Sequence, residues 1–247
     1  MRNRRTIRQA RQRGFSLIEL MIVLLILTIM MGAIFQQINL VQQRNTSEAA
    51  KLDMFQQTRE FMDQMARDLR QAGYPSPRNF NRGYLTAIPM ANDYHAAVGL
   101  VKVASGDLWF EGDVDGTGNV SVVHYHLDTS TTGGCPCLRR SQQQKITADP
   151  VTGQTTPVYQ VEVQNVQNTD IFSAFLRGST GTPVTLPVDF DANPTTMAAI
   201  DTVKVVLTVQ SKIADPKTGQ RPYATLVSTV RLNNCSQAIS GYYMSCR

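Results

Sequence analysis

The sequence lacks the short motifs that identify several large classes of enzymes. It contains no phosphate-binding P-loop, no GxGxxG dinucleotide fingerprint and no arrangement of Ser, His and Asp that is typical of a hydrolase. No internal repeat is evident in its 247 residues. We therefore expect a protein that is not an enzyme and that has no catalytic residues.

Charge is scarce as well, because only 17% of the residues are Asp, Glu, Lys or Arg. The formal net charge is +5, but the first 14 residues contain no acid and six arginines, namely Arg2, Arg4, Arg5, Arg8, Arg11 and Arg13. Without them, 18 of the 24 basic side chains remain against 19 acidic ones, so the net charge of the remainder is about −1. The basicity therefore gives no reason to expect a nucleic acid as partner.

Proline is missing between Phe15 and Tyr74, and Gly32 is the only interruption among helix-forming residues. Residues 15–35 are apolar almost throughout, and a helix of these 21 residues spans about 30 Å, the thickness of a bilayer core. The arginines before this segment place its N-terminal end in the cytoplasm. We therefore expect a single-pass helix in the inner membrane, with the rest of the chain in the periplasm.

Two ordinary explanations of the apolar segment fit poorly. A secretory signal peptide would end at a small-x-small cleavage site, which this run lacks. An ordinary signal anchor leaves Glu19 unexplained, because a carboxylate inside a membrane span is costly and is normally kept for a partner. Cleavage between Gly14 and Phe15 would create a free amine, and helix geometry favours pairing of Glu19 with the amine of a neighbouring subunit.

The residues from Arg13 to Leu20 read RGFSLIEL, with a basic leader before them and an apolar helix after them. This arrangement resembles the class III signal of type IV pilins and pseudopilins. The resemblance implies that residues 1–14 are a leader, that a prepilin peptidase cuts after Gly14, and that Phe15 becomes the methylated N-terminus. It also implies that Glu19 neutralises the N-terminus of an adjacent subunit during assembly.

The helix is expected to continue beyond the membrane as an amphipathic segment over residues 36–73. Apolar residues recur there at helical spacing, at Leu52, Phe55, Met62, Met65 and Leu69. Gly73 can cap the C-terminal end and Pro75 prevents continuation. The sequence thus predicts one helix from residue 15 to about residue 72.

Residues 74–247 are predicted to form a β-rich globular domain. Six segments have the composition or alternation of strands, namely 97–104, 107–111, 119–128, 158–166, 201–213 and 223–232. Residues 141–157 have the composition of an exposed loop. Because the strands follow one long helix without further helices between them, the predicted fold class is α+β, with the helix packed on antiparallel sheet as in a pilin fold.

Three looser features resemble PilW-type minor pilins and the GspJ-type pseudopilins of type II secretion. They are FEGDVDG at residues 110–116 before a Val-Val-x-Tyr strand, LRR at 138–140 and VRLN at 230–233. The resemblance implies a structural subunit that helps to prime a type IV pilus at or near its tip. A minor pseudopilin remains an alternative, as does a tip adhesin or DNA-uptake pilin. The implied partners are the prepilin peptidase, other minor pilins and the major pilin, and the implied process is twitching motility or cell adhesion.

The four cysteines favour disulfides, because their number is even and the chain is expected to be exported. Cys235 and Cys246 are spaced to close a C-terminal loop, and we expect this pair. The pairing of Cys135 and Cys137 stays open, since a disulfide across one residue is strained and either cysteine could instead reach the C-terminal pair. Their spacing does not match a zinc ribbon.

One turn raises the question of calcium. Oxygen-bearing side chains alternate over DVDGTGN, at Asp113, Asp115, Thr117 and Asn119, with a glycine at the sixth position as in an EF-hand loop. The twelfth position is His124, however, where such a loop needs a bidentate glutamate. A plain hairpin turn explains the same residues and is the favoured interpretation, so no cofactor is expected.

The remaining candidates for chemistry are histidines and aromatic residues. His124 and His126 lie two apart on a predicted strand and therefore face the same side. No third metal ligand is evident, and His95 lies far away in the sequence, so a solvated strand face is favoured. Trp109 and Phe110 are assigned to the core rather than to an exposed contact patch.

Overall fold

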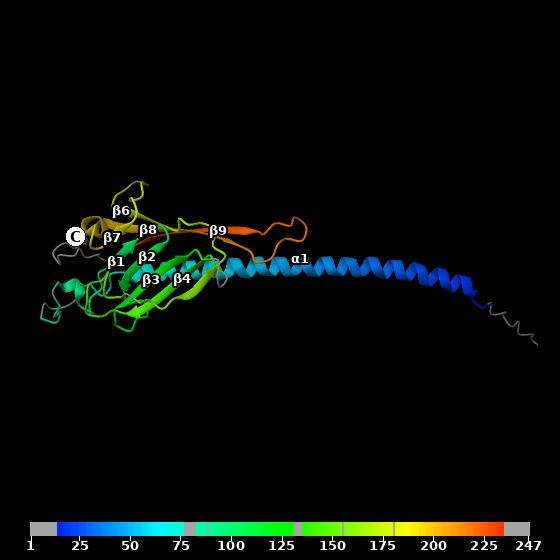
Figure 1. Ribbon diagram of the computed structural model, residues 1–247, viewed down its shortest axis with the longest axis horizontal. Coiled ribbons are helices and arrows are strands. Elements are labelled where there is room, and N and C mark those ends of the chain that lie inside the picture. The colour runs from blue at the N-terminus through cyan, green and yellow to red at the C-terminus, as the bar shows by residue number, and fades with distance from the viewer. Residues whose placement is uncertain are drawn as a thin grey trace, which may run out of the picture.

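The computed structural model describes residues 14–76, 83–87, 89–130, 135–154, 156–179 and 181–234. Its longest element is α1 (Leu17–Gln71), a single helix of 55 residues and therefore about 83 Å long. The N-terminal part of α1 projects from the rest of the protein, while its C-terminal part packs against β-sheet (Figure 1). The predicted helix is confirmed, with ends within two residues of those expected.

The C-terminal end of α1 is fixed by the glycine that the sequence indicated. Gly73 has a φ angle of 81°, in the left-handed region that favours glycine. Its N–H group donates to the carbonyl of Glu111 at 2.8 Å, so the end of the helix is tied to the sheet. The isolated bridge between Ala72 and Gly112 continues this contact.

Only part of the predicted apolar stripe on α1 is buried. Met62, Met65 and Leu69 are at most 5% exposed, as expected, and so is Phe61. The prediction is wrong for Leu52 and Phe55, which are 60% and 40% exposed. The covered side of α1 extends at least as far as Ser47, which is 4% exposed, and Met54 packs against the core. Leu52 and Phe55 therefore lie on a side of the helix that the sheets do not cover.

The body contains two sheets in which every strand pairing is antiparallel, as predicted. The six-stranded sheet has the order β5-β4-β3-β2-β1-β7, and the three-stranded sheet has the order β6-β8-β9. The strands are β1 (Leu100–Val103), β2 (Asp107–Gly112), β3 (Ser121–Asp128), β4 (Cys137–Gln144), β5 (Gln160–Gln164), β6 (Phe172–Leu176), β7 (Val188–Asp189), β8 (Ile200–Gln210) and β9 (Tyr223–Arg231).

The core lies between the C-terminal half of α1 and the two sheets. Its largest fully buried side chains include Tyr125, Phe110 and Phe172, which come from both sheets. The alternation of buried and half-buried residues along β8 gives one face to this core. The hairpin of β8 and β9 extends along α1 toward its projecting part (Figure 1), and Ile213 and Pro216 line a cleft with Asn39 and Thr46 of the helix.

Among the described residues, five elements were not predicted, and one of them contradicts a prediction. β4 includes residues 141–144, which were expected to belong to an exposed loop. These residues pair with Ser121 to His124 of β3, although their side chains are Ser and Gln. Tertiary pairing outweighs the weak strand preference of this polar run. The other four elements are the 3-10 helix η2 (Met90–Asn92), β6, β7 and the short helix α2 (Pro194–Ala199).

Candidate functional site

The segment around the predicted cleavage point lies at the free end of α1. Gly14, Phe15 and Ser16 precede the first helical residue, and Phe15 is 81% exposed. A Cβ atom added to Gly14 would meet no atom within 4 Å. Within the part of the chain that the structure describes, nothing around Gly14 requires glycine, so a requirement for glycine there would point to a binding partner.

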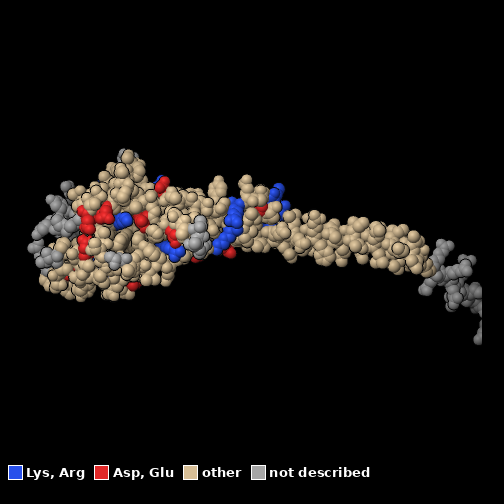
Figure 2. Space-filling view, viewed as in Figure 1, with Lys and Arg blue, Asp and Glu red and all other residues tan. Residues whose placement is uncertain are grey.

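Glu19 lies in the first turn of α1 and is exposed. Between Phe15 and Gln43 it is the only charged residue in the sequence. The positive end of the helix dipole favours a carboxylate in the first turn, although this effect is modest. Figure 2 shows that the projecting helix is uncharged over nearly all of its visible length, and that Lys and Arg side chains gather where it meets the body.

The projecting half of α1 is apolar on every side. Within the described ranges, α1 is the one helix long and apolar enough to cross a membrane, with a mean hydropathy of 2.7 in its most apolar window. No residue of that window is buried against the body. A helix that is apolar all round requires lipid or other helices around it. The segment fits a single-pass anchor in the inner membrane.

A cluster of three polar side chains joins α1 to the six-stranded sheet. The guanidinium of Arg140 on β4 donates to Asp68 Oδ2 of α1 at 2.9 and 3.1 Å, and the Tyr125 hydroxyl donates to the same oxygen at 2.8 Å. Burial, and then the negative charge of Asp68, raise the pKa of Tyr125 well above its usual value. Arg140 belongs to the LRR feature, which therefore serves to hold the helix on the sheet.

The body also contains a buried ion pair, between Lys145 and Glu111. Lys145 Nζ donates to Glu111 Oε2 at 2.7 Å and to the carbonyls of Ala91 and Ala96 at 2.7 and 2.8 Å. Both charged side chains are at most 2% exposed. Glu111 Oε2 also accepts the N–H of Val98 at 3.0 Å. The glutamate of the FEGDVDG feature thus fixes the segment between α1 and β1.

The DVDGTGN turn is held by its own hydrogen bonds. Asp115 Oδ1 accepts the N–H and the hydroxyl of Thr117, and Asp113 Oδ2 accepts the N–H of Gly118. The hydroxyl and N–H of Thr117 lower the pKa of Asp115. Gly116 and Gly118 have φ angles of 68° and 83°. The turn explains both glycines, as the favoured interpretation expects, and calcium binding stays an alternative prediction.

The structure shows the disulfide pairing of two of the four cysteines. Cys135 and Cys137 form a disulfide with each other, which selects one of the alternatives that the sequence left open. Asp128 lies next to them, but sulfur atoms in a disulfide are not thiolate ligands for a metal. The predicted pair of Cys235 and Cys246 lies outside the described residues.

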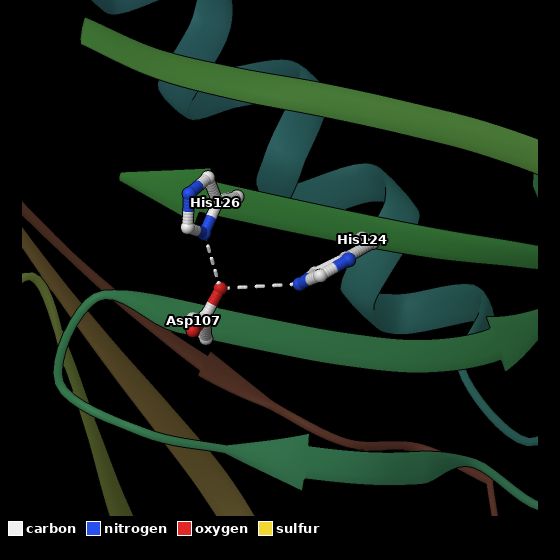
Figure 3. A group of neighbouring side chains, drawn as sticks. All are labelled: Asp107, His124 and His126. Carbon is white, nitrogen blue, oxygen red and sulfur yellow. Dashed lines mark hydrogen bonds and ion pairs between the residues drawn. The ribbon is translucent and has the colours of Figure 1, made fainter. Parts of the chain in front are cut away.

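Asp107, His124 and His126 form a cluster that the sequence did not indicate (Figure 3). Asp107 begins β2 and lies directly opposite His126 of β3. Asp107 Oδ1 lies 3.1 Å from His124 Nε2 and 2.7 Å from His126 Nδ1. Both rings turn toward Asp107, which confirms that the two histidines share a face.

The expectation of a solvated strand face is wrong for His124 and holds only in part for His126. The side chains of His124 and His126 are 15% and 40% exposed, and both have a carboxylate partner. Asp107 was missed because it comes from the neighbouring strand, and its position depends on the register of the β2–β3 hairpin. His95 lies elsewhere, as expected, and its ring contacts Asp93.

Aromatic side chains complete the surroundings of the histidine pair. The ring of Trp109 stacks on His124 with centroids 5.1 Å apart, and the Tyr159 hydroxyl lies 2.7 Å from His124 Nδ1. Burial would raise the pKa of Asp107, but the hydrogen bonds from both histidines outweigh it and hold that pKa well below its usual range. Burial and the charge of Asp107 raise the pKa of Tyr159 to about 12. Phe110 is fully buried and Trp109 packs against the core, as predicted.

The chain thus combines a long helix, whose N-terminal half is apolar and exposed, with an antiparallel β-body. This is the architecture of membrane-anchored proteins whose apolar helix is covered by lipid or by the helices of other molecules. The prokaryotic N-terminal methylation motif matches residues 9–35, which include Gly14, Phe15 and Glu19. The chain is therefore type IV pilin-like, with an α+β pilin-like architecture. Neither the comparison with curated proteins nor that with solved structures gives a match.

Proposed function

We propose that this protein is a minor pilin, a structural subunit of a type IV pilus that helps to prime filament assembly at or near the tip. The observation that carries the proposal is Glu19, an isolated carboxylate on the exposed apolar half of α1. Such a group in an apolar environment needs a cationic partner. The new N-terminus of a neighbouring subunit supplies one, and packing of the helices buries the apolar surface.

Processing comes before assembly in this proposal. The prepilin peptidase cuts between Gly14 and Phe15, in the non-helical backbone before α1, and Phe15 is then methylated. Removal of the leader takes away six arginines and leaves the anchor helix with an amine at its end. Because Glu19 accepts the amine of another subunit, this protein lies within a stack of helices rather than alone at its top.

The minor role is supported by the features that resemble PilW-type proteins. Glu111 and Arg140 belong to two of them. Arg140 holds β4 on α1 through Asp68, and Glu111 forms a buried ion pair with Lys145. The same features fit a minor pseudopilin of a type II secretion system. A deletion strain separates the two functions, because loss of pili and twitching supports the minor pilin, whereas loss of secreted hydrolases with normal pili contradicts it. Loss of adhesion with normal pili would instead support a tip adhesin.

Two substitutions test the N-terminal chemistry in the producing bacterium. Gly14→Trp should block cleavage and leave the unprocessed chain in the membrane fraction. Glu19→Ala should be cleaved normally and yet be depleted from sheared filaments. Glu48→Ala is the matched control, since Glu48 is the next acid on the same exposed helix and makes only a 3.8 Å ion pair with Lys51. Normal processing of Gly14→Trp, or equal incorporation of the Glu19 and Glu48 variants, would contradict the proposal.

A further inference from the structure

We propose that Asp107, His124 and His126 bind a divalent first-row transition-metal ion, for which Zn²⁺ is the appropriate probe. The three side chains come from two adjacent strands, β2 and β3, and not from a loop. Their candidate ligand atoms all lie within 4.8 Å of one another. Figure 3 shows both imidazole rings directed at the same carboxylate oxygen.

The spacing needs little change to admit an ion. In a tetrahedral zinc site with bonds of about 2.0 Å, neighbouring ligand atoms are about 3.3 Å apart. Asp107 Oδ1 now lies 3.1 Å from His124 Nε2 and 2.7 Å from His126 Nδ1. Lengthening these two distances to about 3.3 Å needs movements of a few tenths of an ångström to about half an ångström, which rotation of the Asp107 side chain can supply. The candidate ligand nitrogens of the two histidines lie at most 4.8 Å apart, so closer approach of the two rings completes the geometry.

The kinds of ligand select the class of ion. Two imidazole nitrogens with one carboxylate suit zinc, copper, nickel or iron, whereas calcium and magnesium prefer oxygen ligands throughout. Three protein ligands leave at least one coordination position open. His126 is 40% exposed, so that position can be reached by water or by a ligand from another molecule. This site is separate from the DVDGTGN turn, whose ligands would all be oxygen.

Tyr159 supplies the outer contact that metal-binding histidines normally have. His124 Nε2 lies 3.1 Å from Asp107 Oδ1, and the Tyr159 hydroxyl lies 2.7 Å from His124 Nδ1. Because a carboxylate can only accept, a neutral His124 donates from Nε2–H and accepts the Tyr159 hydroxyl at Nδ1. On binding, His124 Nε2 gives its lone pair to the ion, and its proton is carried by Nδ1, where the Tyr159 oxygen accepts the hydrogen bond. The stacked ring of Trp109 limits rotation of His124 further. Such outer contacts orient the ligand and strengthen binding.

The charges around the site permit a cation. Arg139 lies opposite His126 in the β3–β4 pairing, but its guanidinium is paired with Asp128 at 2.9 Å. Asp107 supplies the negative charge that faces the ion. An ion here would join the start of β2 to β3 and, through Tyr159, to the residues that precede β5.

The experiment uses the full-length chain, produced without a histidine tag, solubilised in detergent and stripped of metal with a chelator. Titration with Zn²⁺ against a chromophoric competitor should give one site per chain, and Co²⁺ should give visible absorption bands typical of nitrogen and oxygen ligands. His126→Gln and Asp107→Asn should lose this site. Tyr159→Phe should keep the site with affinity reduced by about 10–100-fold, as for other outer contacts.

His95→Gln is the matched control, because it removes the third histidine of the chain but leaves the cluster intact. The metal-free melting temperature of each variant shows whether it is folded, and the Co²⁺ spectrum reports on ligands independently of stability. Loss of one zinc site in the cluster variants, with retention in His95→Gln, supports the proposal. Equal binding by wild type and the folded Asp107→Asn and His126→Gln variants overturns it, as does absence of binding by the wild type.

Discussion

Charged side chains inside the body each have a specific set of partners. Lys145 and Glu111 neutralise each other, and Asp68 receives the guanidinium of Arg140. Asp93 instead accepts the backbone N–H groups of Thr86, Ala87 and His95. A charge taken out of water is tolerated only with such compensation, so removal of one partner costs more than loss of the contact itself.

Lys145→Met tests the buried ion pair. The substitution leaves Glu111 buried without its cation, so the free energy of unfolding should fall by about 3–5 kcal/mol. The double variant Glu111→Leu with Lys145→Met should be less destabilised than the sum of the single variants, because no charge remains uncompensated. Urea unfolding of the four proteins measures this coupling. Strict additivity would contradict a direct interaction.

Asp93 should make stability depend on pH in the acid range. Burial raises the pKa of Asp93, but the hydrogen bonds from His95, Ala87 and Thr86 outweigh it and lower that pKa to about 2. The unfolded value is about 3.9, so the stabilisation is present above about pH 4 and is lost as the pH falls through about 2. Asp93→Asn should therefore be less stable than wild type at pH 6, with the difference shrinking toward pH 2. A difference in melting temperature that is equal at both pH values would contradict this account.

Among the elements, α1 meets β2 most closely at its C-terminal end. A Cβ atom on Gly112 would lie 2.5 Å from the carbonyl oxygen of Gln71 and 3.3 Å from Ala72 Cα. Both neighbours are backbone atoms, which cannot rotate away as a side chain could. Glycine at this position is therefore needed for the close approach of the strand to the helix end.

Gly112→Ala should destabilise the protein by about 1–3 kcal/mol through this overlap. Gly83→Ala is the matched control, because nothing lies within 4 Å of its added Cβ atom. Thermal unfolding followed by circular dichroism compares the two variants. If both melt as the wild type does, the helix end and β2 are not in the contact described.

Elements that depend on local sequence signals could be predicted, whereas elements that depend on pairing with distant residues could not. α1 and its end at Gly73 could be predicted, because apolar runs, the lack of proline and a capping glycine are local signals. β4 could not, since its polar residues adopt a strand only by pairing with β3. The cluster of Asp107 with two histidines was missed for the same reason, as a strand register places Asp107 opposite His126.

The protein has two parts that differ in how their apolar surface is covered. The body buries its own core between α1 and two sheets, whereas the N-terminal half of α1 is exposed on every side. A water-soluble protein does not keep such a surface uncovered. The function proposed above, cleavage at the membrane followed by packing of the helix among other subunits, would account together for the methylation motif, the projecting helix and Glu19.

Mass spectrometry of the N-terminal peptide tests this explanation most directly. The chain is isolated from the membranes and sheared filaments of the producing bacterium, and from a strain that lacks its prepilin peptidase. We predict that the mature chain begins at N-methylated Phe15, and that it retains residues 1–14 in the strain without the peptidase. An N-terminus other than Phe15 in the normal strain, or the same N-terminus in both strains, would contradict the account.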